Sequence, residues 1–249
     1  MTARGQHLPR DGAENAEKNS LRPHLKQQWC IPPEQNAAFV CAMEDVLDVY
    51  ERPVNARFPV ICFDEKPCQL IRDVRQPVQA QPGRLQRQDS EYERCGTANV
   101  FGWVEPLTGR RDAWVTARRT SIDYAHALKR VSEAYPDAVQ IVLVQDNLST
   151  HSKAALYHAF PAPEARRLAA RFDFHFTPRH GSWLNMQELE FSALARQALQ
   201  ERVGDQAALE STVTHWIGRR CAAAIPIRWQ FTTPDARIKL CRLYPKMIG

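Results

Sequence analysis

The chain has 249 residues, of which 44% are hydrophobic and 24% are charged, and its formal net charge is +5. This length fits one large domain or one domain with an arm, and this composition excludes disordered, collagen-like and coiled-coil chains. The apolar stretches are far shorter than the roughly 20 residues that cross a bilayer, so we expect no membrane partner.

The polar N-terminus and the cysteines both predict a cytoplasmic protein. Residues 1–28 lack apolar periodicity and the apolar segment of a secretory signal, so we expect a flexible arm there. The seven cysteines include no CxxC pair. They predict reduced thiols rather than a disulfide framework or a structural zinc site.

Hydrophobic periodicity predicts alternating helices and strands along the rest of the chain. Apolar residues three and four apart follow Pro32 and predict a helix, which we interpret as a linker over residues 29–53. The later predicted elements are strands at 59–65, 99–106, 111–117, 140–145 and 172–178, and helices at 121–135, 150–171, 184–203 and 207–224. A Pro-, Gln- and Arg-rich stretch at 72–94 is typical of extended surface chain. This alternation favours an α/β fold with a partly parallel sheet.

Two of the predicted strands end in an aspartate: Asp64 follows VICF, and Asp146 follows IVLVQ. Acids at the carboxyl ends of neighbouring strands converge in one crevice, although an aspartate at such a place is also a common helix cap. In the predicted helix 184–203, Glu188 lies on a stripe of otherwise apolar residues, with Glu190 on another side. A charge on such a stripe is costly unless it is paired or binds a metal, so we expect Glu188 to join the two aspartates.

Three carboxylates form an all-oxygen site that suits Mg²⁺ or Mn²⁺ rather than zinc or copper. Two such ions, about 4 Å apart, can hold the attacking and leaving oxygens of a phosphodiester displacement. The loop before Glu188 carries Arg179 and His180, which can face a phosphate. These residues predict a metal-dependent enzyme of phosphoryl transfer on nucleic acid.

The C-terminal segment 219–249 has seven basic residues against one acid, with three aromatic residues among them. This pattern is typical of a phosphate-contacting tail with stacking groups, and equally of a solvated basic surface. The candidate DNA contacts are Arg219, Arg220, Lys239 and Arg242.

Three motifs carry a resemblance to a known enzyme family: CFDEKP around Asp64, VQDNLSTH around Asp146 and PRHGSWLNMQELE around Glu188. Intervals of 82 and 42 residues separate the three acids. With RRT at 118–120 and FTTPDAR at 231–237, the similarity runs from about Trp29 to Tyr244. The chain resembles the DDE-type transposases of the mariner-like superfamily, in their bacterial insertion-sequence branch.

This resemblance implies a ribonuclease H-like fold, with a mixed β-sheet flanked by helices, in a catalytic domain at 54–249. It also implies two divalent ions, Mg²⁺ or Mn²⁺, with Asp64, Asp146 and Glu188 as their ligands. The implied partners are double-stranded DNA, as the terminal inverted repeats of an element and as target DNA, and a second copy of the chain in a homodimer.

Glu65, Asn147 and His151 also match the motifs. The resemblance implies supporting or DNA-contacting roles for them. The alternatives are a structural role for Glu65, a helix cap for Asn147 and a surface histidine for His151.

Members of this family carry helix-turn-helix modules ahead of the catalytic domain, and residues 1–28 are too few and too polar for one. We therefore expect DNA cleavage and strand transfer at the ends of an insertion sequence without the usual module that reads those ends. Two alternatives stay open: a catalytically silent remnant that binds DNA or a partner transposase, and a ribonuclease H-like nuclease.

Overall fold

Five strands form one mixed sheet in the order β3-β2-β1-β4-β5. The computed structural model describes residues 34–246, so the predicted arm at 1–28 lies outside the described residues. The strands are β1 (Val60–Asp73), β2 (Tyr92–Val104), β3 (Arg111–Thr116), β4 (Ile141–Gln145) and β5 (Phe172–Phe176). β2 is antiparallel to β1 and β3, whereas β4 is parallel to β1 and β5. The predicted α/β fold with a partly parallel sheet is confirmed.

Several of the described helices begin at a side chain that caps them. The described helices are α2 (Ala37–Tyr50), α3 (Ser121–Ala134), α4 (Ala154–Ala159), α5 (Ala162–Ala170), α6 (Gln187–Gln197), α7 (Gln206–Ala223) and α8 (Thr233–Lys239), with 3-10 turns η1 (Ser182–Leu184) and η2 (Cys241–Leu243). Asn36 accepts a hydrogen bond from the N–H of Phe39 at 2.9 Å, and Thr120 and Thr232 each form a capping box with an aspartate. These bonds satisfy N–H groups that the first helical turn leaves without partners.

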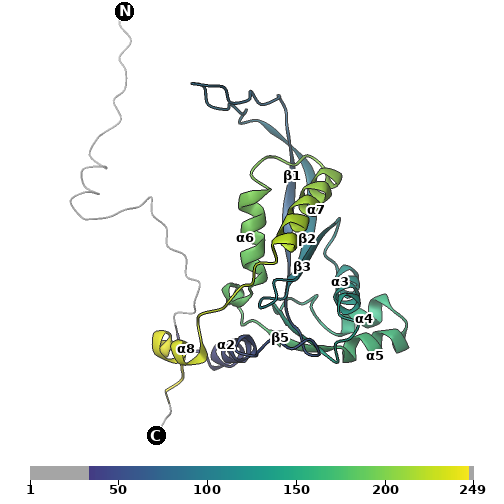
Figure 1. The fold of residues 1–249 in the computed structure, drawn as a ribbon, viewed down its shortest axis with the longest axis vertical. Helices are drawn as coiled ribbons and strands as arrows, with labels where there is room; N and C mark the ends of the chain where they lie inside the picture. Colours follow the sequence, from purple (N-terminus) through teal and green to yellow (C-terminus); the bar gives the residue numbers. More distant parts are fainter. Residues whose placement is uncertain (1–33, 247–249) are drawn as a thin grey trace, which may run out of the picture.

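Helices cover both faces of the sheet (Figure 1). On one face, α3, α4 and α5 pack over Ile61 and Phe63 of β1. Cys62, between those two residues, packs on the opposite face with α2, and α6 and α7 cover the outer part of β1 and β2 on that same face. Because side chains alternate along a strand, Asp64 belongs to the face of α2 and α6, and Glu65 to the face of α3.

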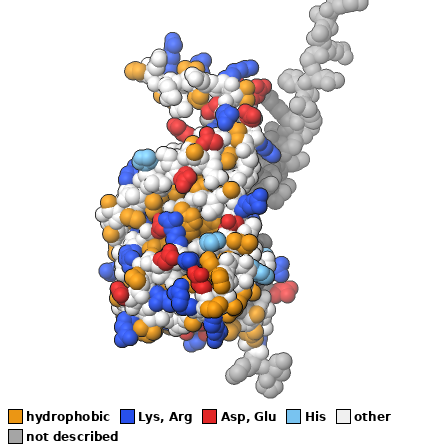
Figure 2. All heavy atoms as spheres, turned by 90° about the vertical axis from the view of Figure 1, so that its right-hand side faces the viewer, with side chains coloured by type: hydrophobic (Ala, Val, Ile, Leu, Met, Phe, Trp, Pro, Cys, Tyr) orange, Lys and Arg blue, Asp and Glu red, His pale blue; other side chains and the backbone are white. Residues whose placement is uncertain are grey.

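The sequence predicted that this strand ends at Asp64, but β1 continues to Asp73. Beyond the end of β4 it keeps pairing with β2 as far as Tyr92, so the two strands form a ribbon that projects from the rest of the sheet (Figure 1). The prediction was wrong because antiparallel pairing with β2, rather than an apolar run, holds this part of the strand. Basic and hydrophobic side chains, including Arg75, Val78 and Leu85, are exposed towards the end of the ribbon (Figure 2).

The C-terminal segment is folded against α2. Arg237 donates to both carboxylate oxygens of Glu44 on α2, at 2.9 and 3.0 Å, and the Tyr244 hydroxyl donates to the same carboxylate at 2.7 Å. Trp229, Phe231 and Tyr244 pack against the core cluster that contains α2. These three rings are therefore partly buried against the protein, because packing on the apolar side of α2 is more favourable than full exposure to water.

Among the helices of residues 34–246, none has both the length and the hydropathy of a bilayer span. The cysteines in this range are free thiols, as the sequence predicted, and Cys30 lies outside it.

Candidate active site

The parallel pairing of β1 with β4 places two of the predicted acids beside each other. Its register matches Val60 with Val142 and Cys62 with Val144. Two residues further along each chain come Asp64 and Asp146, at the point where β4 ends and β1 continues. The convergence predicted from the two strands therefore occurs.

Asp64 is a buried carboxyl group among other acids, with 7% of its surface exposed. Its Oδ1 accepts the N–H of Glu65 at 2.8 Å, and its Oδ2 accepts a hydrogen bond from Nδ2 of Asn185 at 3.3 Å. Burial, followed by the negative charges of Asp146 and Glu188, raises the pKa of Asp64 to about 8. A cation at this place would relieve both effects.

The third acid, Glu188, is exposed in the first turn of α6. The predicted stripe through Glu188 is wrong, because Leu184 lies in η1 and Glu188 is not on the buried side of α6. The residues of α6 that are buried are Gln187, Glu190, Phe191 and Leu194. The charge of Glu188 nevertheless raises the pKa of Asp64.

His151 lies between two acids of the quoted motifs. Its Nε2 is 2.9 Å from Oε2 of Glu65, and its Nδ1 is 2.5 Å from Oδ1 of Asp146. Burial lowers the pKa of His151, but hydrogen bonds and charges of Asp146 and Glu65 outweigh burial and raise the pKa to about 10. His151 is only 3% exposed, so the alternative of a surface histidine is wrong.

A family model described as DDE superfamily endonuclease matches residues 59–210, which include all three acids. The chain belongs to this superfamily. No curated protein matches its sequence.

Solved structures of Mos1 transposase share the fold of this DDE superfamily member. The match to a Mos1 strand transfer complex has a TM-score of 0.52 and 15% identity, and it covers 86% of this chain and 62% of that chain. A Mos1 paired-end complex with the left transposon end matches with a TM-score of 0.52 and 12% identity, over 86% and 66% of the two chains. The chain thus spans less than two thirds of the Mos1 length. The similarity confirms a ribonuclease H-like fold.

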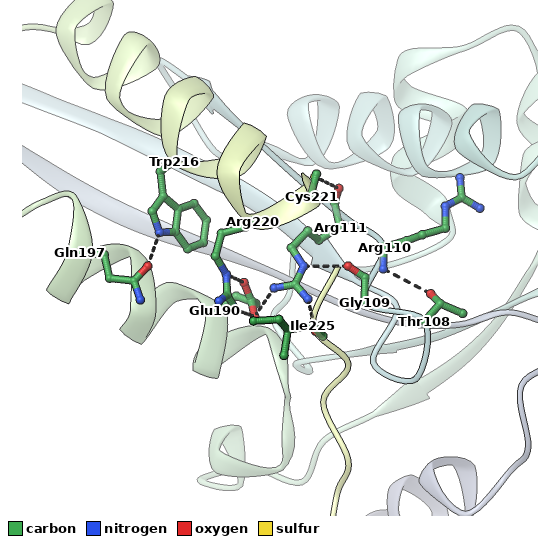
Figure 3. A network of polar contacts seen from close by, with 10 residues as sticks. All are labelled: Thr108, Gly109, Arg110, Arg111, Glu190, Gln197, Trp216, Arg220, Cys221 and Ile225. Carbon is green, nitrogen blue, oxygen red and sulfur yellow. Dashed lines mark hydrogen bonds and ion pairs between the residues drawn. The ribbon is translucent and has the colours of Figure 1, made fainter. Parts of the chain in front are cut away.

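Glu190, two residues after Glu188, holds α6 against the sheet (Figure 3). Arg111 on β3 donates to its Oε1 at 2.9 Å, and Arg220 on α7 donates to its two oxygens at 3.1 and 2.5 Å. Arg111 also donates to the backbone oxygen of Ile225 at 2.5 Å. This buried cluster joins three elements, and it engages one of the arginines that the sequence assigned to DNA.

Sequence analysis missed two residues that shape the site. Asn185 is 1% exposed; its Nδ2 bonds a backbone oxygen of β1 at 2.9 Å as well as Asp64, and its Oδ1 accepts the N–H of Gln187 at 3.1 Å. Gly102 pairs with Asp64 across β1 and β2, and a Cβ atom there would lie 2.5 Å from the side chain of Gln187. Both had a signal in the sequence, since Asn185 is in the motif of Glu188 and Gly102 interrupts a predicted strand.

The other predicted residues lie outside this cluster of acids. Asn147, Arg179 and His180 are exposed in the loops after β4 and β5, and Asn147 does not cap α4, whose N-cap is Lys153. Among the tail residues, Arg219 is exposed on α7, Arg242 lies in η2, and Lys239 is 3.5 Å from Asp235 within α8.

The donors at the site fit a hard divalent cation by their chemistry. Carboxylate oxygens are the ligands that Mg²⁺ and Mn²⁺ prefer. Such a cation would neutralise the negative charges of Asp146 and Glu188 that act on Asp64. As they stand, no three acidic, histidine or cysteine side chains within residues 34–246 are grouped closely enough to hold an ion.

Proposed function

We propose that this chain is a transposase catalytic domain of the mariner-like type, which cleaves DNA at the ends of an insertion sequence and joins the freed ends to target DNA. The observation that carries the proposal is the pairing of β1 with β4, which brings Asp64 beside Asp146, together with the charge of Glu188 that acts on Asp64. The Mos1 matches, a strand transfer complex and a paired-end complex with a transposon end, support DNA as the substrate.

Asp64, Asp146 and Glu188 would hold two ions of Mg²⁺ or Mn²⁺. A further Mos1 match, at a TM-score of 0.50, is a paired-end complex with Mn. Such ions, when bound, activate the attacking water or 3′-hydroxyl and stabilise the leaving oxygen. The chain's own contribution is to orient the carboxylates, with Asn185 donating to Asp64.

Double-stranded DNA is the proposed partner, and two copies of the chain bind two element ends together. Exposed arginines support this partner. Arg119 is half exposed and lies 3.9 Å from Glu65, and Arg179 is exposed in the loop after β5. Positive groups beside an acidic catalytic centre attract the phosphates of a duplex.

The test is nicking of supercoiled plasmid, and joining of a labelled duplex with a free 3′-hydroxyl to that plasmid, by the purified full chain. Reactions contain Mg²⁺, Mn²⁺ or EDTA. We expect nicked and joined products with either metal, none in EDTA, and none with Asp146→Asn, which keeps the size of the side chain but removes its charge.

Other outcomes would favour the alternatives. Metal-dependent nicking without joined products would favour a ribonuclease H-like nuclease. Bound DNA without any product, equally for the wild-type chain and Asp146→Asn, would favour a silent remnant.

A further inference from the structure

Both ring nitrogens of His151 face acceptors inside the protein. Nε2 lies 2.9 Å from the carboxylate of Glu65, and Nδ1 donates to the backbone oxygen of Asp146 at 3.3 Å and lies 2.5 Å from Oδ1 of the same residue. The side chains of His151 and Glu65 are 1% and 3% exposed. Because an imidazole has only two positions for hydrogen bonds, neither is left for a phosphate or a base.

Aromatic side chains fix the plane of the His151 ring. Tyr124 on α3 stacks on it, with ring centroids 4.5 Å apart and planes at 25°, and Phe63 contacts it edge-on at 6.1 Å. The Tyr124 hydroxyl donates to Oε1 of Gln145 at 2.8 Å. Gln145 directly precedes Asp146. The end of β4 therefore carries Asp146 and also binds Tyr124, the ring that stacks on His151.

Glu65 connects to both aspartates of the site. Its backbone N–H donates to Oδ1 of Asp64 at 2.8 Å. Its side chain lies on the opposite face of β1, where one carboxylate oxygen faces His151 and the other lies 3.9 Å from Arg119. The carboxylate of Glu65 is therefore directed away from Asp64 and towards the histidine.

We infer that Glu65 and His151 are positioning residues, which together hold Oδ1 of Asp146 and leave its Oδ2 to bind a divalent cation. Neither residue contacts DNA or ligates the metal. This inference rests on the proposed function, because it assigns Asp146 to a cation. Carboxylates and histidines that support metal ligands from outside contribute about 10- to 100-fold to metal affinity.

The test measures Mn²⁺ affinity of the full chain without DNA, by electron paramagnetic resonance of free Mn²⁺. We expect His151→Ala to weaken binding about 10- to 100-fold. Glu65→Gln, which keeps size and an oxygen acceptor for Nε2–H and so preserves the fold, should weaken it less, in the same direction. Nicking by both variants should recover at raised Mn²⁺, and duplex binding in EDTA should stay at the wild-type level.

Two comparison variants define the range of the measurement. His215→Gln changes an exposed histidine of α7 and should bind Mn²⁺ as the wild-type chain does. Asp146→Asn removes the proposed ligand itself, and raised Mn²⁺ should not restore its nicking.

Each contrary result has a distinct meaning. Wild-type Mn²⁺ affinity in Glu65→Gln and in folded His151→Ala would overturn the positioning role, as would a loss of duplex binding in EDTA, which would make His151 a DNA contact. Loss of binding in Glu65→Gln as complete as in Asp146→Asn would make Glu65 a ligand. A wild-type chain that binds no Mn²⁺ would overturn the proposed function, and this inference with it.

Discussion

At the scale of single residues, the buried carboxyl group of Asp64 should make the stability of the chain depend on pH. Its pKa of about 8 lies well above the ordinary value of 3.8, so the folded state favours the protonated form. Stability that is fully present below about pH 4, where both states are protonated, is therefore lost progressively as the pH rises from about 4 to about 8 in the absence of metal. Asp64→Asn cannot ionise and should remove this loss, raising the free energy of unfolding above pH 8 by about 1–3 kcal/mol.

Urea unfolding in EDTA, repeated from below pH 3.8 to above about pH 8, measures the effect of Asp64→Asn on the unfolding free energy. Asp137→Asn, at an exposed acid after α3, is the matched control and should leave the pH dependence unchanged. Adding Mn²⁺ should stabilise the wild-type chain much more than Asp64→Asn. If Asp64→Asn kept the wild-type pH dependence, the buried and repelled state of Asp64 would be contradicted.

Asn185 makes a second prediction at this scale. Asn185→Ala removes a donor to the ionised form of Asp64 and leaves the backbone oxygen of Phe63 without that partner. The unfolding free energy should fall by about 1–3 kcal/mol. The pKa of Asp64 should rise further, so Mn²⁺ binding, which requires the ionised acid, should shift to higher pH.

A pH titration of Mn²⁺ affinity separates these two effects of Asn185→Ala. A loss of stability with an unchanged midpoint would mean that Asn185 only joins η1 to β1. A shifted midpoint would establish it as a positioning residue for Asp64.

At the scale of elements, strands that show as local apolar runs were predicted from the sequence. Strand segments and contacts that depend on pairing between distant residues were not. The apolar run of β4 and the strand before Asp64 are visible locally, and their parallel pairing sufficed to predict that Asp64 and Asp146 converge. The outer half of β1 is held by β2 and has no such pattern. The hydrogen bond of Asn185 to Asp64 spans 121 residues, and that of His151 to Glu65 spans 86, so no local spacing predicts either.

The buried face of α6 was also predicted wrongly from the sequence. The buried residues of α6, Gln187, Glu190, Phe191 and Leu194, lie three and four residues apart, so Glu190 faces the core and Glu188 faces solvent, which reverses the burial expected from the stripe. The role that the motif implies for Glu188 stays a prediction, whereas the burial that the stripe predicted for Glu188 is wrong.

Gly102 determines how closely α6 approaches the acids. A Cβ atom on Gly102 would lie 2.5 Å from Nε2 of Gln187 and 3.3 Å from Phe191, and Gln187 is 2% exposed and has little room to move. Gly102→Ala should therefore displace the start of α6, lower the unfolding free energy by about 1–3 kcal/mol and weaken Mn²⁺ binding.

The matched control for Gly102→Ala is Gly218→Ala in α7, where an added Cβ meets no atom within 4 Å. That variant should be stabilised by about 0.5–1 kcal/mol, as expected for glycine within a helix, with Mn²⁺ affinity unchanged. Equal Mn²⁺ affinity in the two variants would show that the contact of α6 with β2 does not position Glu188.

At the scale of the whole molecule, positive charge is dispersed over several elements. Basic and acidic side chains are interspersed on the face shown in Figure 2, and the basic C-terminal segment is folded against α2. A net charge of +5 attracts DNA without specifying where it binds. Measuring how the salt dependence of DNA binding changes when single basic side chains are replaced locates the duplex on this surface.

Arg219 and Arg220 are neighbours on α7 and allow a matched comparison. Arg219 is exposed, whereas Arg220 is held by Glu190. If the duplex crosses this end of α7, Arg219→Ala should reduce the slope of log affinity against log salt by about one unit. Arg220→Ala should leave the slope unchanged and instead lower the unfolding free energy by about 1–3 kcal/mol, because the buried Glu190 loses a charged donor.

Fluorescence anisotropy of a labelled duplex, titrated between about 50 and 200 mM salt in EDTA, measures both slopes. Chemical unfolding of the same preparations measures both stabilities. An unchanged slope in Arg219→Ala would remove this end of α7 from the DNA interface. A reduced slope in Arg220→Ala would mean that its ion pair with Glu190 opens when DNA binds, because a guanidinium that stays on a buried carboxylate releases no counterions from the duplex.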